Sequence, residues 1–253
     1  MNIPRSIWML LCVAALSSGC DKNAVQDITG PLPGGARIKF FNFGVSSPGV
    51  NFYANDTKMT AITSATGIES TSGVAYGSAG SGGLYMAIAA GQYTLKGKIA
   101  AATDKDLAVS NLPVTLADGK FYSFYQSGIY NTTSKTVDAF MVEDPLPAQF
   151  DFTTAYVRFV NAIYNANAMT LYAKNTTTLA EAAVGGSVAY KAAGAFVAVP
   201  NGTYDLGARY AGVTTNALSR TGVSFSAGRV YTITARGDIT VATTQLLDNT
   251  TNR

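Results

Sequence analysis

The residues in this sequence that could do chemistry are a few carboxylates, because the 253 residues include no histidine. This excludes catalytic groups of the Ser-His-Asp or Cys-His type and zinc sites that use histidine. The acids Asp104 and Asp106 lie two residues apart and could bind a cation such as Ca²⁺, which prefers oxygen ligands. A charged hairpin loop explains the same pattern, and we adopt that interpretation.

The second pair of acids, Glu143 and Asp144, is adjacent in the sequence. Neighbouring residues of a strand point to opposite faces. Two carboxylates that flank one glycosidic bond must instead face the same cleft. We therefore interpret this pair as a solvated strand end and expect no catalytic residue, no metal and no cofactor.

Residues 77–83 are rich in glycine but lack the Lys-Ser/Thr pair of a phosphate-binding loop, and no helix is predicted after them. We interpret them as a flexible connection between strands. The net charge of +3 is small, whereas nucleic-acid binding usually needs clustered lysine and arginine. We expect no nucleic-acid partner.

Cys20 has the most specific setting of any reactive residue. Residues 7–16 form an apolar run that is too short to cross a bilayer as a helix, which takes about 20 residues. Small residues follow, and Cys20 comes directly after Gly19. This pattern resembles the lipobox of bacterial lipoproteins, although Ser17 stands where leucine is usual. An ordinary signal peptide with a chance cysteine is the alternative.

The cysteine count favours lipid attachment. The chain has two cysteines, and Cys12 lies in the segment predicted to be removed. Cys20 would then be the single thiol of the mature chain, so no disulfide could form within it. We expect residues 1–19 to be a signal peptide and residues 20–35 to be a tether. The mature protein would be anchored by lipid in the bacterial cell envelope, with the outer membrane as the expected site and either the periplasm or the cell surface as the expected side.

Comparison of the chain with itself reveals an internal repeat. Five short blocks recur in the same order, about 110 to 120 residues apart. One copy is therefore roughly the size of a normal domain. Two prolines lie between the copies, where they exclude a central strand. The matching blocks are residues 36–42 with 155–161, 52–54 with 171–173, 74–76 with 188–190, 90–95 with 201–206 and 116–123 with 225–232.

Within each copy, apolar and polar residues alternate with a period of two. Tyr93 and Leu95, for example, alternate with Thr94 and Lys96. Such alternation is typical of strands with one buried and one wetted face. We predict an all-β chain of two tandem antiparallel β-sandwich domains, immunoglobulin-like or prealbumin-like, with about seven to nine strands each. The predicted domains are residues 36–144 and 155–253, joined by a linker at residues 145–154.

The repeated blocks resemble the DUF4397 family. In the first copy the resemblance rests on an opening strand at residues 37–42, the pair Phe52-Tyr53, a Gly-x-Tyr-x-Leu element at residues 91–95 and the block at residues 118–122. Members of that family are exported, are often lipid-anchored and have no established activity. The resemblance therefore implies a β-sandwich outside the cytoplasm but no reaction. The second copy shows the same series at residues 156–161, 171–172, 202–206 and 227–231.

The first copy carries aromatic side chains on a second face of its strands. Phe41, Phe43, Phe121 and Tyr125 lie opposite the predicted core side. Because monomers seldom expose large apolar patches, we expect the second domain, a loop such as residues 60–83 or an external ligand to cover this face. A bulge that alters the alternation is a further alternative. The matching residues of the second copy are smaller: Val160, Ala162, Val230 and Thr234.

These observations predict a lipid-anchored binding, adhesion or scaffold module outside the cytoplasm, with no catalytic activity of its own. Its partners would be the membrane, through the N-terminal lipid, and a glycan or an envelope protein. The alternative is a carboxylate-dependent polysaccharide hydrolase or an accessory carbohydrate-binding protein of a glycan-uptake system. Two acids about 5–10 Å apart in one cleft would favour the hydrolase.

Overall fold

The computed structural model describes residues 34–60 and 71–253. These residues belong to one compact unit, residues 34–253. The predicted signal peptide, Cys20 and most of the predicted tether lie outside the described residues. No helix within the described ranges is long and apolar enough to cross a membrane.

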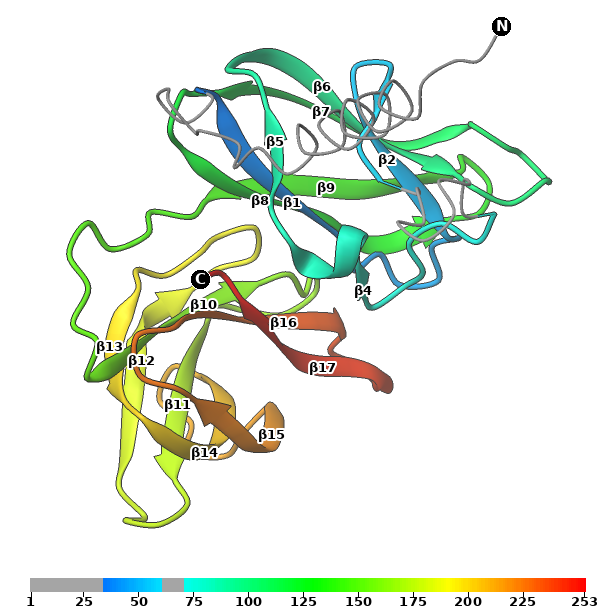
Figure 1. The fold of residues 1–253 in the computed structure, drawn as a ribbon. Coiled ribbons are helices and arrows are strands. Elements are labelled where there is room, and N and C mark those ends of the chain that lie inside the picture. Colours follow the sequence, from blue (N-terminus) through cyan, green and yellow to red (C-terminus); the bar gives the residue numbers. More distant parts are fainter. Residues whose placement is uncertain (1–33, 61–70) are drawn as a thin grey trace, which may run out of the picture. The chain divides into compact units, whose positions relative to one another are not determined.

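The described chain consists mainly of strands, which confirms the all-β prediction (Figure 1). Strands β1–β9 form the first sandwich, with sheet orders β4-β1-β8-β9 and β3-β2-β6-β7, and β5 also pairs with β1. A 3₁₀ turn at Gly80–Gly83 follows β4. The strands are β1 (Ala36–Asn42), β2 (Val50–Ala54), β3 (Thr57–Lys58), β4 (Ser78–Ala79), β5 (Met86–Ile88), β6 (Gly91–Ile99), β7 (Ala108–Leu116), β8 (Phe121–Asn131) and β9 (Thr136–Glu143).

Strands β10–β17 form the second sandwich, with sheet orders β13-β10-β16-β17 and β12-β11-β14-β15. Most pairs in both sandwiches are antiparallel, as predicted, but β1 runs parallel to β8 and β10 runs parallel to β16. A parallel pair needs a long crossover, which here passes through the opposite sheet. The strands are β10 (Thr154–Asn161), β11 (Met169–Asn175), β12 (Glu181–Val188), β13 (Val197–Pro200), β14 (Gly202–Tyr210), β15 (Leu218–Phe225), β16 (Val230–Asp238) and β17 (Val241–Thr251).

The pairing register shows that the two sandwiches follow one plan. Phe41 of β1 lies opposite Tyr125 of β8, and their counterparts Val160 of β10 and Thr234 of β16 also lie opposite each other. The sequence blocks that revealed the repeat therefore occupy the same structural positions. Residues of the two sandwiches can be compared pair by pair.

The core of the first sandwich is built around three phenylalanines. Phe40, Phe52 and Phe124 are fully buried, and their ring centroids lie 5.1–5.6 Å apart. Phe40 comes from β1 and Phe124 from β8, so both point to the face that the alternation assigned to the core. Phe52 of β2 reaches them from the other sheet.

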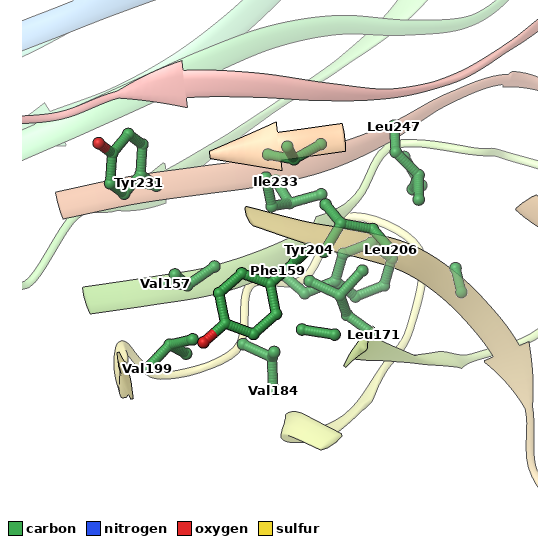
Figure 2. Close-up of a cluster of buried hydrophobic side chains, with 14 of the residues drawn as sticks. Val157, Phe159, Leu171, Val184, Val199, Tyr204, Leu206, Tyr231, Ile233 and Leu247 are labelled. Carbon is green, nitrogen blue, oxygen red and sulfur yellow. The ribbon is translucent and has the colours of Figure 1, made fainter. Parts of the chain in front are cut away.

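The core of the second sandwich keeps one of these rings and has aliphatic side chains at the other two positions. Phe159, Leu171 and Ile233 occupy the equivalent positions and are fully buried. Figure 2 shows these side chains together with Leu206 and Val184, which lie in the same sheet as Leu171 and face Phe159 and Ile233 of the other sheet. Burial of each such side chain stabilises the fold by about 1.5–3 kcal/mol. Because the two clusters share no residue, each sandwich has a core of its own.

Candidate functional site at the contact between the sandwiches

A third apolar cluster lies between the two sandwiches, separate from both cores. Tyr125 is its centre: the ring is fully buried and stacks on Phe41 at 4.8 Å and on Phe140 at 5.0 Å between centroids. The cluster joins the outer faces of the sheets that contain β1 and β10. Its buried members are Phe41, Phe43, Tyr125, Phe140 and Val142 from the first sandwich and Val160 and Ala162 from the second.

The structure therefore places the second sandwich over most of the predicted aromatic face. Phe41, Phe43 and Tyr125 have exposed fractions of 3%, 2% and 0%. Phe121 lies apart from them, half-buried, with its ring edge-on to Tyr85 at 5.1 Å. These four residues do not form an open aromatic platform.

A buried ion pair joins the sandwiches beside this cluster. The side chains of Arg158 in β10 and Asp144 after β9 are fully buried, and Nη2 of the guanidinium donates to Asp144 Oδ1. Nη1 donates to the carbonyl oxygen of Glu143 at 2.9 Å, and Nε donates to Thr232 Oγ1 at 3.0 Å. Because removal of two charges from water is costly, a buried pair of this kind depends on complete hydrogen bonding.

This placement corrects the interpretation of Glu143 and Asp144 as a solvated strand end. Glu143 is exposed, and its carboxylate pairs with Lys120 at 2.8 Å. Asp144 instead extends the ladder by one residue, since its amide donates to the carbonyl oxygen of Phe121 at 2.7 Å. Its carboxylate is buried and accepts a hydrogen bond from Ser123 Oγ at 2.7 Å.

Lys39 occupies in β1 the position that Arg158 occupies in β10. It is also buried, and its Nζ donates to the carbonyl oxygen of Thr251 at 2.6 Å. Thr251 is the counterpart of Glu143. Each cation therefore donates to the equivalent carbonyl oxygen of the other sandwich, Lys39 to Thr251 and Arg158 to Glu143. Burial lowers the pKa of Lys39 to about 8, and the nearby Asp144 carboxylate opposes that shift.

Each of the two cations lies over an aromatic ring of its own sandwich. Lys39 Nζ is 4.2 Å from the ring centre of Tyr85, and Arg158 Cζ is 4.7 Å from that of Phe196. Tyr85 and Phe196 directly precede β5 and β13, which pair with β1 and β10 in the same register. The contact therefore has an approximate two-fold relation, as expected when like surfaces meet.

The two halves of the contact differ in charge at the position of Asp144. The counterpart of Asp144 is Asn252, whose amide likewise extends its ladder by donating to Val230 at 2.7 Å. Tyr85 bridges the two, because its hydroxyl donates to Asp144 Oδ2 at 2.6 Å and accepts from Asn252 Nδ2 at 3.0 Å. Burial and the Asp144 charge raise the pKa of Tyr85, which keeps its hydroxyl a neutral donor.

A cleft of about 400 Å³ opens at the edge of this contact. Residues 77–84 of the first sandwich form one wall, and residues 248–251 of β17 form the other. The rings of Phe41 and Phe43 lie between the two walls. The volume falls within the range of sites for small ligands, about 300–1,000 Å³.

An ion pair stands beside the cleft. Arg236 Nε donates to Asp248 Oδ2, and the guanidinium carbon lies 4.9 Å from the ring centre of Tyr76 and 5.6 Å from that of Phe43. Burial raises the pKa of Asp248, and the Arg236 charge opposes the shift. A Cβ on Gly77 would lie 2.9 Å from the guanidinium carbon, so glycine allows this wall to pack closely on Arg236.

The other predicted carboxylates lie away from the cleft. Asp104 and Asp106 are exposed in the loop between β6 and β7, and Asp104 pairs with Lys135 at 2.6 Å. Residues 34–60 and 71–253 contain no cluster of three or more acids, cysteines or histidines suited to a metal ion.

Four residues of the contact and the cleft were not predicted as site residues from the sequence: Lys39, Arg158, Arg236 and Asp248. A signal existed for the first two, because a cation recurs at the same position of the opening block in both copies. No comparable signal marks Arg236 and Asp248. Their surroundings depend on how the two sandwiches meet, which the alternation within one copy does not specify.

Comparison with known proteins supports the predicted family for the second copy. Residues 155–253 match the family model described as a domain of unknown function, DUF4397, and the first copy is not matched. No curated protein matches the chain. Among solved structures, a leucine-rich repeat protein from Bacteroides thetaiotaomicron VPI-5482 matches at 13% identity and a TM-score of 0.21. The match covers 81% of this chain and 26% of that protein, so the chain spans about a quarter of its length.

Proposed function

We propose that this chain is a lipid-anchored binding module of the bacterial cell envelope, built from two DUF4397 copies held in one unit. The anchor is supported by the apolar segment before Cys20 and by the lack of any other cysteine after it. The second family copy is supported by the equal register of β1 with β8 and of β10 with β16. The two copies therefore form one unit, and some of its surface is built from residues of both copies.

The ligand site of the module is the cleft between residues 77–84 and residues 248–251. The observation that carries this proposal is the combination, in one cleft, of a carboxylate, an exposed apolar side chain and a strand edge. Asp248 and Thr250 offer polar groups, Leu84 is 71% exposed and offers apolar surface, and β17 is an edge strand with main-chain groups that β16 does not use. Sugars present hydroxyl groups and apolar ring faces together, so a short segment of polysaccharide is the ligand class that fits.

Binding without catalysis agrees with the acids of the cleft. Among the described residues that line it, Asp248 is the single carboxylate, and Arg236 neutralises it. A glycosidase flanks its bond with two carboxyl groups about 5–10 Å apart. The proposed module therefore holds a glycan and leaves its hydrolysis to other proteins.

Gly82→Asn tests the cleft. Gly82 lines it with a φ of 65°, and a Cβ there would meet nothing within 4 Å. Asparagine tolerates this left-handed backbone, so the change should fill the cleft without loss of stability. Calorimetric titration with a panel of defined cello-, malto-, xylo- and chito-oligosaccharides should show binding by the native chain that weakens about tenfold or more in the variant.

Gly212→Asn is the matched control, because Gly212 has a φ of 73°, open surroundings and no contact with the cleft. It should leave binding unchanged. Equal weakening by both substitutions, or no binding of any oligosaccharide by the native chain, would contradict the cleft as a glycan site.

The anchor has a separate test. Cys20→Ala should remove the lipid and move the protein from the membrane fraction to the soluble fraction. Fractionation of cells that express each form measures this. An unchanged membrane pool for the variant would show that Cys20 does not carry the anchor.

A further inference from the structure

The contacts between the sandwiches fix the relative direction of their strands. At one level Lys39 in β1 bonds Thr251, which pairs with the start of β16 and so lies beside the start of β10. At a second level Ser127 Oγ donates to the carbonyl oxygen of Ala162 at 2.7 Å, and both residues lie just beyond the ends of β1 and β10. The strands β1 and β10 therefore point the same way. Both begin at one end of the pair, which we call the starting end.

The chain that leads to Cys20 leaves from the starting end. Gly35, directly before β1, donates its amide to Asp118 Oδ1 and accepts a hydrogen bond from the amide of Gly119 at 2.9 Å. Residues 21–34 separate Cys20 from this point. A chain of that length spans at most about 50 Å when fully extended. A lipid on Cys20 therefore holds the starting end within about that distance of the bilayer.

The starting end of the second sandwich carries two large apolar side chains in solvent. Phe152, just before β10, is 70% exposed. Leu179, in the turn between β11 and β12, is 67% exposed, and this turn lies next to the start of β14. Leu84, which is 71% exposed, lies in the cleft wall. The five other exposed large apolar side chains of the described chain lie at the opposite end and are less exposed than Phe152 and Leu179: Leu107, Ile129, Tyr164, Val213 and Val241.

Leu179 stands in a position that leucine rarely occupies. Its φ is 62°, in the left-handed region that favours glycine and asparagine. Within the protein this side chain is 67% exposed, so little burial offsets the backbone strain. An apolar environment outside the protein would bury the side chain and offset the strain.

Phe152 lies beside one neighbouring ring, that of Phe150, which is itself packed. Its ring centroid lies 6.3 Å from that of Phe150, which lies 5.7 Å from that of Tyr156. The Arg253 guanidinium carbon lies 4.1 Å from the ring centre of Phe150. The exposed ring is thus the outermost of three neighbouring rings, and its outer side is free to contact another surface.

We propose that the starting end of the second sandwich rests in the interface of the bilayer that holds the protein, with Phe152 and Leu179 inserted. This inference rests on the proposed anchor at Cys20. Aromatic and leucine side chains at protein surfaces bind the boundary between headgroups and acyl chains. The neighbouring charges have both signs, Asp151 with Arg229 and Arg253, so apolar insertion is the main contribution to the contact and the two arginines add attraction to lipid phosphates.

Tryptophan fluorescence in vesicles tests the contact. Trp8 is the single tryptophan of the sequence and lies in the predicted signal peptide. Trp8→Phe, combined with Phe152→Trp, Leu179→Trp or Val213→Trp, gives three reporters in the lipidated protein. Val213 is the control, since it is 47% exposed in the turn between β14 and β15 at the opposite end. Phosphatidylcholine vesicles with and without brominated acyl chains are compared.

Brominated chains should reduce the emission of the reporters at positions 152 and 179 to roughly half or less and leave that at position 213 unchanged. Equal emission in both vesicles at positions 152 and 179 would overturn the proposal. Flotation of the protein with the vesicles is measured separately and reports the anchor. If the protein does not float, coupling of the Cys20 thiol to a maleimide lipid, in a chain with Cys12→Ser, supplies the tether and the same comparison decides the inference.

Discussion

The two sandwiches have a cation at the same position of their facing sheets, but the two cations have different partners. Arg158 meets the carboxylate of Asp144, whereas Lys39 meets a main-chain carbonyl oxygen and the neutral Asn252 stands where an acid would be. A contact between identical surfaces would repeat one interaction twice. The difference makes one surface the specific partner of the other. Among the described residues, Arg158–Asp144 is the buried ion pair of this contact, and the second pair across it, Lys191 with Asp138 at 2.6 Å, is exposed to solvent.

A second difference concerns volume. Phe41, Phe43 and Tyr125 of the first sandwich project from positions that hold Val160, Ala162 and Thr234 in the second. Tyr125 and Thr234 even meet, with 3.5 Å between their side-chain oxygens. Large rings on one face thus pack over small residues on the other. The bulk that distinguishes the copies in sequence is what fills the contact between them.

The largest effect should come from the charge that makes the contact specific. Asp144→Asn recreates in the first sandwich the residue found in the second and leaves Arg158 buried without a countercharge. Loss of one partner of a buried pair costs about 3–5 kcal/mol, and the free energy of unfolding from urea titration should fall by that order. Glu143→Gln, one residue earlier and exposed, is the control and should leave stability nearly unchanged. Equal losses for the two variants would mean that the buried pair contributes nothing specific.

The next effect should follow ring volume. Tyr125→Ala removes a fully buried ring from the contact and should cost about 3 kcal/mol or more. The equivalent change in the other copy, Thr234→Ala, removes far less volume and should cost about 1 kcal/mol. Urea titration of both variants measures the ratio. A Tyr125→Ala variant as stable as the native chain would show that the ring is not buried by the second sandwich.

The smallest effect depends on pH and separates the two cations. Folded Lys39 loses its proton near pH 8, whereas the unfolded chain keeps it up to about pH 10.5. Between these values the unfolded state binds more protons, so this group makes stability rise with pH. Relative to Lys39→Met, the native chain should gain about 1–2 kcal/mol between about pH 7.5 and about pH 9.5.

Arg158 is the internal reference for this measurement, because arginine does not titrate in that range. Denaturation of the native chain and of Lys39→Met at a series of pH values gives the difference directly. A difference that stays flat, or that falls as the pH rises, would contradict the burial of Lys39 in the contact.

The sequence predicted the fold because alternation is a local property. The alternation predicts that Phe41 and Phe43 lie opposite the core side, and the structure places them outside the core that contains Ile38 and Phe40. The side chain of Asp144 could not be placed in this way, because its direction depends on one extra ladder bond beyond the end of β9. The cleft could not be predicted from the sequence for a related reason: its two walls come from different copies, and the alternation within one copy does not specify how the copies meet.

The central claim is that the contact joins two sandwiches, each with its own core, into one cooperative unit. Scanning calorimetry of the whole chain tests it directly. We expect a single transition in which the calorimetric and van't Hoff enthalpies agree, and we expect Asp144→Asn to move or split that transition. Two separate transitions in the native chain, unaffected by Asp144→Asn, would show that the sandwiches unfold independently and would contradict the claim.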